Sequence, residues 1–145
     1  MEIYTIGFTK KSAAQFFGAL RDAGIRRLID VRLNNVSQLA GFTKKHDLEY
    51  FLRAIAGIDY VHELRLAPVG EQLETYRGGK LPWDDYATSY RALLRERKVE
   101  QTIPRTLFDV RSVLLCSEAT AEHCHRRLAA EYLAEHWGSV KITNL

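Results

Sequence analysis

Short apolar runs alternate along this chain with segments whose apolar residues recur at helical spacing. The runs predict β-strands at residues 2–6, 28–31, 58–62, 112–118 and 139–142. The segments between them predict helices, since their apolar side chains repeat every three or four residues. Strands that alternate with helices are typical of a layered α/β fold. We therefore expect residues 1–145 to form a single α/β domain, with a mainly parallel sheet flanked by helices.

Several residues mark where the helices begin and end. Ser12 and Gln15 have the spacing of a capping box, in which each side chain binds a free backbone N–H of the new helix. Gly24 and Gly57 follow the first two helices, at a position that favours a left-handed backbone. Pro82 opens the third helix, because proline suits the first helical turn. These signals define the helices between the first strands.

Polar residues follow each of the first four strands. Parallel strands joined by helices place their carboxyl ends on one edge of the sheet, which is where α/β proteins bind ligands. We therefore expect one site at this edge. Its candidate residues are Gly7, Thr9, Asp30, Arg32, His62, Cys116, Glu118, His125 and Arg126.

The arginines in this set favour an anion. Arg32 follows a strand, and Arg126 lies early in a helix that begins at the same edge. Helix N-termini favour anions, and arginine forks bind phosphate in a bidentate manner. A nucleotide or another phosphate-bearing small molecule would suit such a site, with Asp30 or Glu118 as the group that transfers a proton. In the alternative interpretation, Arg126 pairs with one of these carboxylates and only stabilises the turn.

The two cysteines allow a different chemistry. A thiol near a helix N-terminus has a lowered pKa, so Cys116 could serve as a nucleophile or a redox centre, although it could equally be a small apolar residue that ends a buried strand. Cys124 is expected in the helix that opens with residues 123–127, on the face of Ala121, Leu128 and Tyr132, where it would pack. Cys116, Cys124 and a histidine could also hold a metal. Their spacing matches no known zinc pattern, so we assign no metal ligand.

Two long segments, 32–46 and 63–81, contain no clear helix or strand and predict loops. Such loops are often lids or binding loops. Their basic residues could extend a rim over the crevice, and Phe42, Tyr76 and Trp83 could stack on bases. This pattern supports an alternative function as a nucleic-acid-binding or repair-associated accessory domain. A solvated surface with packed aromatic rings is the simpler interpretation.

Composition limits these alternatives. The 21 Lys and Arg against 18 Asp and Glu give a net charge of +3, whereas nucleic-acid modules are usually far more basic. No apolar run approaches the roughly 20 residues that span a bilayer, and the first residues lack the features of a signal peptide. Two cysteines cannot form a secreted disulfide framework. We expect a cytoplasmic protein with reduced thiols and no membrane contact. No motif indicates a cofactor or an oligomeric state.

Six segments occur in the order and spacing of a known family. They are Gly7 with its following loop, Ile29–Arg32, Gly41–Lys44, Tyr60–His62, Cys116–Glu118 and Cys124–Arg126. Together they make the chain resemble the family catalogued as domain of unknown function 488, and the resemblance implies an α/β fold and a shared site. Members commonly carry Gly-His-Ser after the first strand, where this chain has Phe8 and Thr9. Residues 63–68 also depart from the usual Pro-Glu-Leu-Gly-Gly. Both an enzyme and a binding domain therefore stay open.

Overall fold

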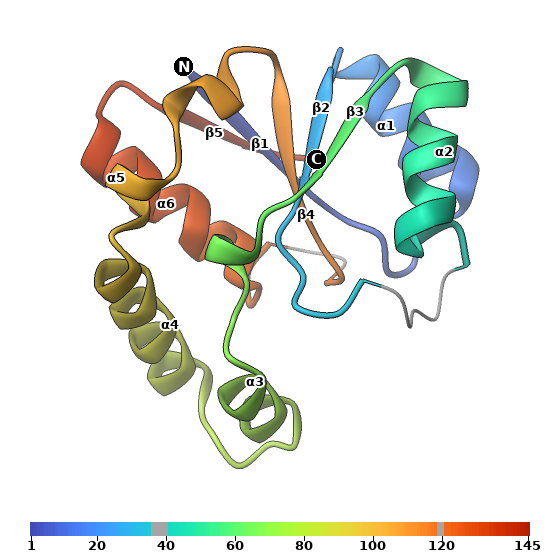
Figure 1. Cartoon of the computed structure of the whole chain (residues 1–145). Helices are drawn as coiled ribbons and strands as arrows, with labels where there is room; N and C mark the ends of the chain where they lie inside the picture. Colours follow the sequence, from blue (N-terminus) through green and yellow to red (C-terminus); the bar gives the residue numbers. More distant parts are fainter. Residues whose placement is uncertain (36–40, 119–120) are drawn as a thin grey trace.

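A five-stranded, all-parallel sheet forms the centre of the protein, with strand order β3-β2-β4-β1-β5 (Figure 1). The computed structural model describes residues 1–35, 41–118 and 121–145. The strands are β1 (Glu2–Gly7), β2 (Arg27–Asp30), β3 (Asp59–His62), β4 (Ser112–Cys116) and β5 (Lys141–Asn144). The predicted α/β fold with a parallel sheet is thus confirmed.

Helices cover both faces of this sheet in the described part of the chain. The α-helices are α1 (Ala13–Asp22), α2 (Lys45–Ala56), α3 (Gly70–Arg77), α4 (Trp83–Arg97), α5 (Val99–Thr102) and α6 (His125–Trp137). Three short 3₁₀ turns are η1 (Gly41–Thr43), η2 (Leu64–Leu66) and η3 (Arg105–Phe108). Within these described residues, no helix has both the length and the apolar character needed to cross a membrane.

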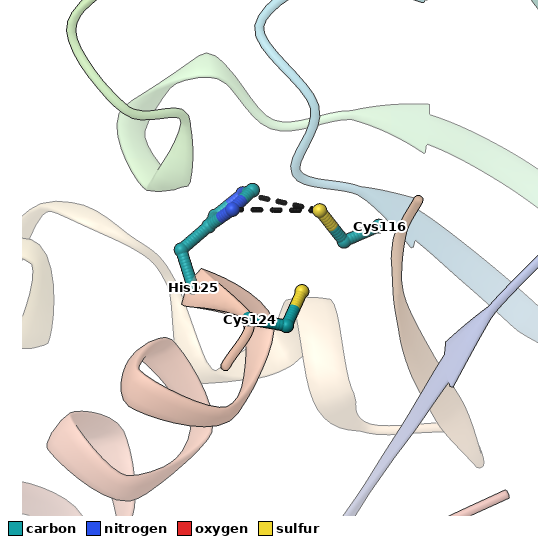
Figure 2. A group of neighbouring side chains, drawn as sticks. All are labelled: Cys116, Cys124 and His125. Atoms are coloured by element: carbon teal, nitrogen blue, oxygen red, sulfur yellow. Dashed lines mark hydrogen bonds between the residues drawn. The ribbon is translucent and has the colours of Figure 1, made fainter. Parts of the chain in front are cut away.

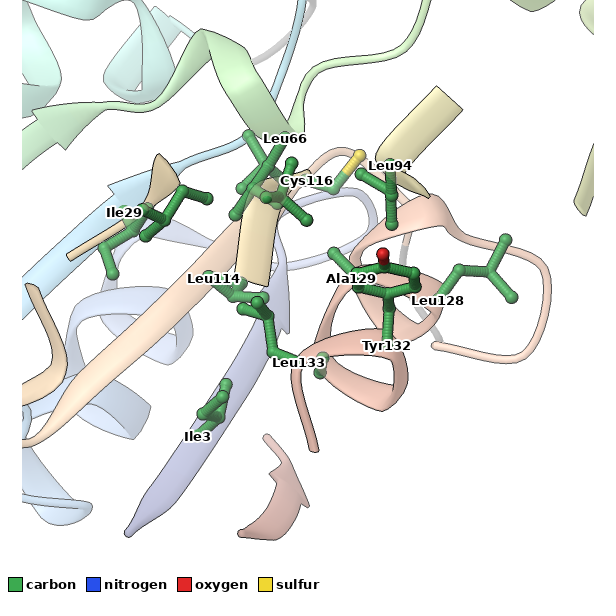
Figure 3. Close-up of a cluster of buried hydrophobic side chains, with 14 of the residues drawn as sticks. Ile3, Ile29, Leu66, Leu94, Leu114, Cys116, Leu128, Ala129, Tyr132 and Leu133 are labelled. Carbon is green, nitrogen blue, oxygen red and sulfur yellow. The ribbon is translucent and has the colours of Figure 1, made fainter. Parts of the chain in front are cut away.

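The buried side chains form one cluster on each face of the sheet. Helices α1 and α2 pack on one face, where Phe16 and Leu52 meet Leu28 and Val113 from the sheet. Helices α4 and α6 pack on the other face, as Figures 1 and 3 show, and their Leu94 and Leu133 join the cluster that contains Ile3, Ile29 and Leu114. The central strand β4 is buried along its whole length, which explains its unbroken apolar sequence.

The predicted helix signals occur where the sequence places them. Ser12 and Gln15 form the capping box, with both reciprocal hydrogen bonds present. Gly24 has φ +70°, and Gly57 ends α2 with φ +62°. Pro82 directly precedes the first residue of α4. Local sequence therefore determines these boundaries.

Two segments differ from the prediction. The stretch from 63 to 81 is not a structureless loop, because it contains η2 and α3. The sequence of α3 lacks the apolar stripe that would predict a helix, and accordingly none of its residues is fully buried. The last helix begins at His125 rather than at His123, since Cys124 has an extended backbone with φ −134° and ψ 137°. Ala119 and Thr120 lie outside the described residues.

The order of the strands creates a crevice. Strands β1 and β4 are neighbours, but β1 leads into α1 on one face and β4 leads towards α6 on the other. The chain segments therefore diverge above the carboxyl ends of these two strands, and such a switch point is where open α/β sheets bind ligands.

Candidate functional site

A cavity of about 510 Å³ lies at the carboxyl edge of the sheet. Segments that follow β1, β2 and β4 line it, together with α3 and the first residue of α6. Its lining residues in the described chain are Phe8, Thr9, Arg32, Leu33, Asn34, Gly70, Leu73, Glu74, Arg77, Cys116, Ser117, Glu118 and His125. The strand ends thus meet around a space large enough for a small molecule.

The nine candidate residues divide into two groups. Those that line the cavity are Thr9, Arg32, Cys116, Glu118 and His125. The other four, Gly7, Asp30, His62 and Arg126, lie outside the described lining. Each of these four lies against a side chain or a backbone atom of a lining residue. The cavity therefore has a lining layer and a supporting layer.

The thiol of Cys116 and the imidazole of His125 face each other in this cavity (Figure 2). Cys116 ends β4 and is 3% exposed, and its Sγ lies 3.4 Å from Nδ1 of His125. The other ring nitrogen, Nε2, lies 2.9 Å from the Val31 carbonyl oxygen. A carbonyl oxygen can only accept, so Nε2 carries the hydrogen. In the neutral ring, Nδ1 is then the unprotonated nitrogen, and it is the nearer of the two to Sγ, with Nε2 at 3.7 Å.

The surroundings of Cys116 favour its thiolate. Burial alone would raise the pKa of Cys116, but hydrogen bonding from the Cys124 thiol and the Ser117 backbone N–H, with the charge of Arg126, outweighs it. The pKa of Cys116 therefore lies below its ordinary value. Burial, assisted by Arg77 and Arg126, lowers the pKa of His125, which keeps the ring neutral. The Cys116 thiol is therefore more acidic than an ordinary cysteine, and it lies beside a neutral imidazole that can accept its proton.

Cys124 stands at the N-cap of α6, and not within the helix as predicted. It is buried, as a packing residue would be, but it also faces the site. Burial and the neighbouring Cys116 raise the pKa of Cys124 well above its ordinary value, so it remains a thiol. The donor atoms of Cys116, Cys124 and His125 lie within 4.8 Å of one another, a spacing that a soft divalent cation could also use.

Arg126 is a fully buried cation behind the cavity, with 0% of its surface exposed. Its Nη1 donates to the Glu118 carbonyl oxygen at 2.6 Å, while its Nε has no hydrogen-bond partner among the described residues. A Cβ on Gly7 would lie 2.8 Å from this Nη1 and would collide with the Glu118 carbonyl oxygen. Gly7 therefore allows the guanidinium and the segment after β4 to approach β1.

Arg32 is held by Asp30 in a buried ion pair. Its Nε and Nη2 each lie 2.8 Å from a carboxylate oxygen, and Nη2 also donates to the Thr43 carbonyl oxygen. Asp30 is 0% exposed and accepts a further hydrogen bond from Tyr60 at 2.6 Å. The bidentate fork of Arg32 thus faces Asp30, and the pair fixes the segment after β2.

His62 and Thr9 bind backbone atoms of neighbouring segments. Nε2 of His62 lies 2.7 Å from the Arg32 carbonyl oxygen, and its Nδ1 faces the amide of Asn35. Thr9 binds the Ser117 carbonyl oxygen through both its hydroxyl and its backbone N–H. These contacts join the ends of β2 and β3 and the ends of β1 and β4.

Helix α3 contributes lining residues that the sequence did not single out, Leu73 and Glu74, beside Arg77. They were missed because the segment was taken for a loop. The aromatic residues considered for base stacking pack instead on other rings, Phe42 against Phe16 and Phe17, and Tyr76 against Trp83. The sequence placed both Cys116, at the end of β4, and His125, at the start of α6, in the site, but it did not predict their contact.

The fold and the cavity define an α/β protein with a cysteine and a histidine at the switch point of a parallel sheet. The family model described as Domain of unknown function DUF488 matches residues 12–133. The chain therefore belongs to this family, and the resemblance seen in the sequence is confirmed. No curated protein and no solved structure matches the chain.

Proposed function

We propose that the protein binds a small anionic molecule in the carboxyl-edge cavity and reacts with it through the thiolate of Cys116. The observation that carries this proposal is the contact between Cys116 Sγ and His125 Nδ1, with the opposite ring nitrogen held by the Val31 carbonyl oxygen. A nucleophile beside a base, with the base oriented by a third group, is the usual arrangement for covalent catalysis.

In this mechanism Nδ1 of His125 accepts the proton of the Cys116 thiol, and the thiolate attacks an electrophilic atom of the bound molecule. The imidazolium then returns the proton to the leaving group. Arg126 stabilises the thiolate through its buried positive charge. We assign Asp30 a positioning role, because Arg32 and Tyr60 already occupy its carboxylate. Of the two carboxylates that the sequence offered for proton transfer, Glu118 lines the cavity and is the one that exchanges a proton with the ligand.

Arg77 is the cation best placed to hold an anionic ligand. It lies in the cavity lining near His125, and no salt bridge of the described residues involves it. Arg32 also lines the cavity, but its fork faces Asp30. A phosphate or carboxylate on the ligand would therefore bind Arg77 first. A reducing, cytoplasmic setting would keep Cys116 available.

Two alkylating reagents with the same reaction and different charge test this proposal. Iodoacetate is an anion and iodoacetamide is neutral, so the ratio of their rates at Cys116, divided by the ratio for free cysteine, measures anion preference. We expect this normalised ratio to exceed one in the native protein and to fall several-fold in Arg77→Gln. Lys80→Gln, which removes a charge outside the lining, should leave it unchanged.

Site-resolved mass spectrometry assigns the alkylation to Cys116. An alkylation rate of Cys116 no higher than that of free cysteine at neutral pH would contradict its role as a nucleophile. An unchanged ratio in Arg77→Gln would contradict the anion site alone. Stoichiometric zinc in the purified protein, with both thiols protected from alkylation, would replace the proposed chemistry by a metal site.

A further inference from the structure

The side chains of Cys116 and Cys124 converge from two different elements. Cys116 ends β4, Cys124 caps α6, and the two sulfurs lie within 4.8 Å of each other (Figure 2). Both are buried and both are free thiols. A structural core would need neither a second thiol here nor a base beside the pair. This arrangement is that of a reactive thiol with a second thiol in reach.

We propose that Cys124 is a resolving cysteine, which makes a disulfide-bearing small molecule the substrate class of the site. This inference rests on the proposed function, because it requires Cys116 to be the attacking thiol. It adds a second chemical step and a product, an internal disulfide between Cys116 and Cys124.

The two steps balance in atoms and electrons. In the first, Cys116 gives its proton to Nδ1 of His125 and its thiolate attacks one sulfur of the substrate disulfide. The substrate S–S bond breaks, and the leaving substrate thiolate takes that proton from the imidazolium. In the second, Cys124 gives its proton to Nδ1 of His125 and attacks Sγ of Cys116. The mixed disulfide breaks, and the second substrate thiolate leaves with that proton. The protein loses two hydrogens, and the substrate disulfide is reduced to two thiols.

The positions of the charges support this order of steps. Cys124 is held as a thiol by burial and by the adjacent Cys116. Once Cys116 is in a neutral mixed disulfide, its charge no longer opposes ionisation of Cys124. The positive charge of Arg126 then remains to favour the second thiolate. Cys124 also stands at the N-terminus of the 13-residue helix α6, where the backbone N–H groups favour an anionic sulfur.

Reaction of the whole protein with dithiobis(nitrobenzoate), a small anionic disulfide, tests the inference. Each attack releases a coloured nitrothiobenzoate, and the chain has only two cysteines. We expect the native protein to release two equivalents, to keep no adduct, and to lose the mass of two hydrogens. Cys124→Ser should release one equivalent and keep the other half of the reagent on Cys116. Cys116→Ser should react far more slowly, and dithiothreitol should reverse both products.

The products separate this inference from the proposed function. A native protein that keeps an adduct on Cys116 and forms no internal disulfide overturns the resolving role, while the reactivity of Cys116 stands. No reaction at Cys116 in either the native protein or Cys124→Ser overturns both. The native protein alone gives the decisive mass, so the test does not depend on the folding of a variant.

Discussion

Nδ1 of His125 lies 3.4 Å from Sγ of Cys116, and this contact joins the first residue of α6 to the last residue of β4. The Val31 carbonyl oxygen, just beyond β2, lies 2.9 Å from Nε2 and so determines which ring nitrogen carries the hydrogen. Three segments that are distant in the sequence therefore determine one proton position. The state of this imidazole should influence both the chemistry and the stability of the protein.

The first prediction concerns stability at acid pH. Burial lowers the pKa of His125, so the unfolded chain binds a proton more readily than the folded protein below about pH 6.5. The unfolded state then gains protons, and the free energy of unfolding falls as the pH drops through this range. His125→Gln keeps a donor for the Val31 carbonyl oxygen but cannot titrate. We expect this variant to lose part of the pH dependence between about pH 6.5 and pH 5, as measured by urea unfolding. Equal slopes for the native protein and His125→Gln would contradict a buried neutral imidazole.

The second prediction concerns the ion pair behind the cavity. Asp30→Asn leaves the buried guanidinium of Arg32 without its carboxylate, so we expect a loss of about 3–5 kcal/mol in the free energy of unfolding. Asp59→Asn removes a partner of Arg27 from an exposed pair at 3.7 Å and should cost less than about 1 kcal/mol. Chemical denaturation of both variants measures the difference. Equal losses would contradict the supporting role of the Asp30–Arg32 pair.

Much of this architecture follows from local sequence. The apolar run that forms β4 and the glycines after α1 and α2 are short-range signals, and they predicted the fold. The sequence also predicted that the residues after the strands lie close together, because parallel strands share a carboxyl edge. The contacts that side chains make with one another at this edge could not be predicted from the sequence. Nothing near Arg32 in the sequence says whether its fork will bind Asp30 or a ligand.

The prediction was weakest where burial is partial or where a helix begins. Helix α3 has no fully buried residue, so no apolar period marks it. Cys124 was placed inside a helix because Leu128 and Tyr132 share its spacing, but an extended N-cap residue interrupts that pattern. The side chain of Cys124 is nonetheless buried in the cluster that contains Cys116 and Leu128, so it packs as the spacing predicts and also lies near Cys116.

The third prediction concerns the close approach at Gly7. An added methyl group would collide with the Glu118 carbonyl oxygen and lie 2.8 Å from Arg126 Nη1, and the colliding group is backbone that cannot rotate away. We expect Gly7→Ala to cost at least about 1–3 kcal/mol and to slow alkylation of Cys116. Gly18→Ala is the matched control, since no atom of the described residues beyond its own stretch of helix lies within 4 Å of its added Cβ. It should be neutral or stabilise by up to about 1 kcal/mol in thermal and urea unfolding. Similar losses in the free energy of unfolding for both variants would contradict the close approach of the Glu118 carbonyl group to Gly7.

The fourth prediction concerns the buried cation. Arg126 is among the groups that lower the pKa of Cys116, so Arg126→Met should raise that pKa, and Arg126→Lys should retain part of the effect. Arg127→Met removes the neighbouring charge, which pairs with Glu131 on the helix surface, and should leave the pKa of Cys116 unchanged. The pH dependence of iodoacetamide alkylation reports the shift. A pKa that does not rise in Arg126→Met would remove Arg126 from the site.

The alkylation rate of Cys116 in the native protein, followed by site-resolved mass spectrometry from about pH 5 to pH 10, tests the central claim most directly. A free cysteine titrates near pH 8.5. Because the surroundings of Cys116 lower its pKa, the rate should reach half its maximum below that value and remain substantial at neutral pH. A midpoint at or above that of free cysteine would mean that burial dominates, and Cys116 would then be a packing residue rather than a nucleophile.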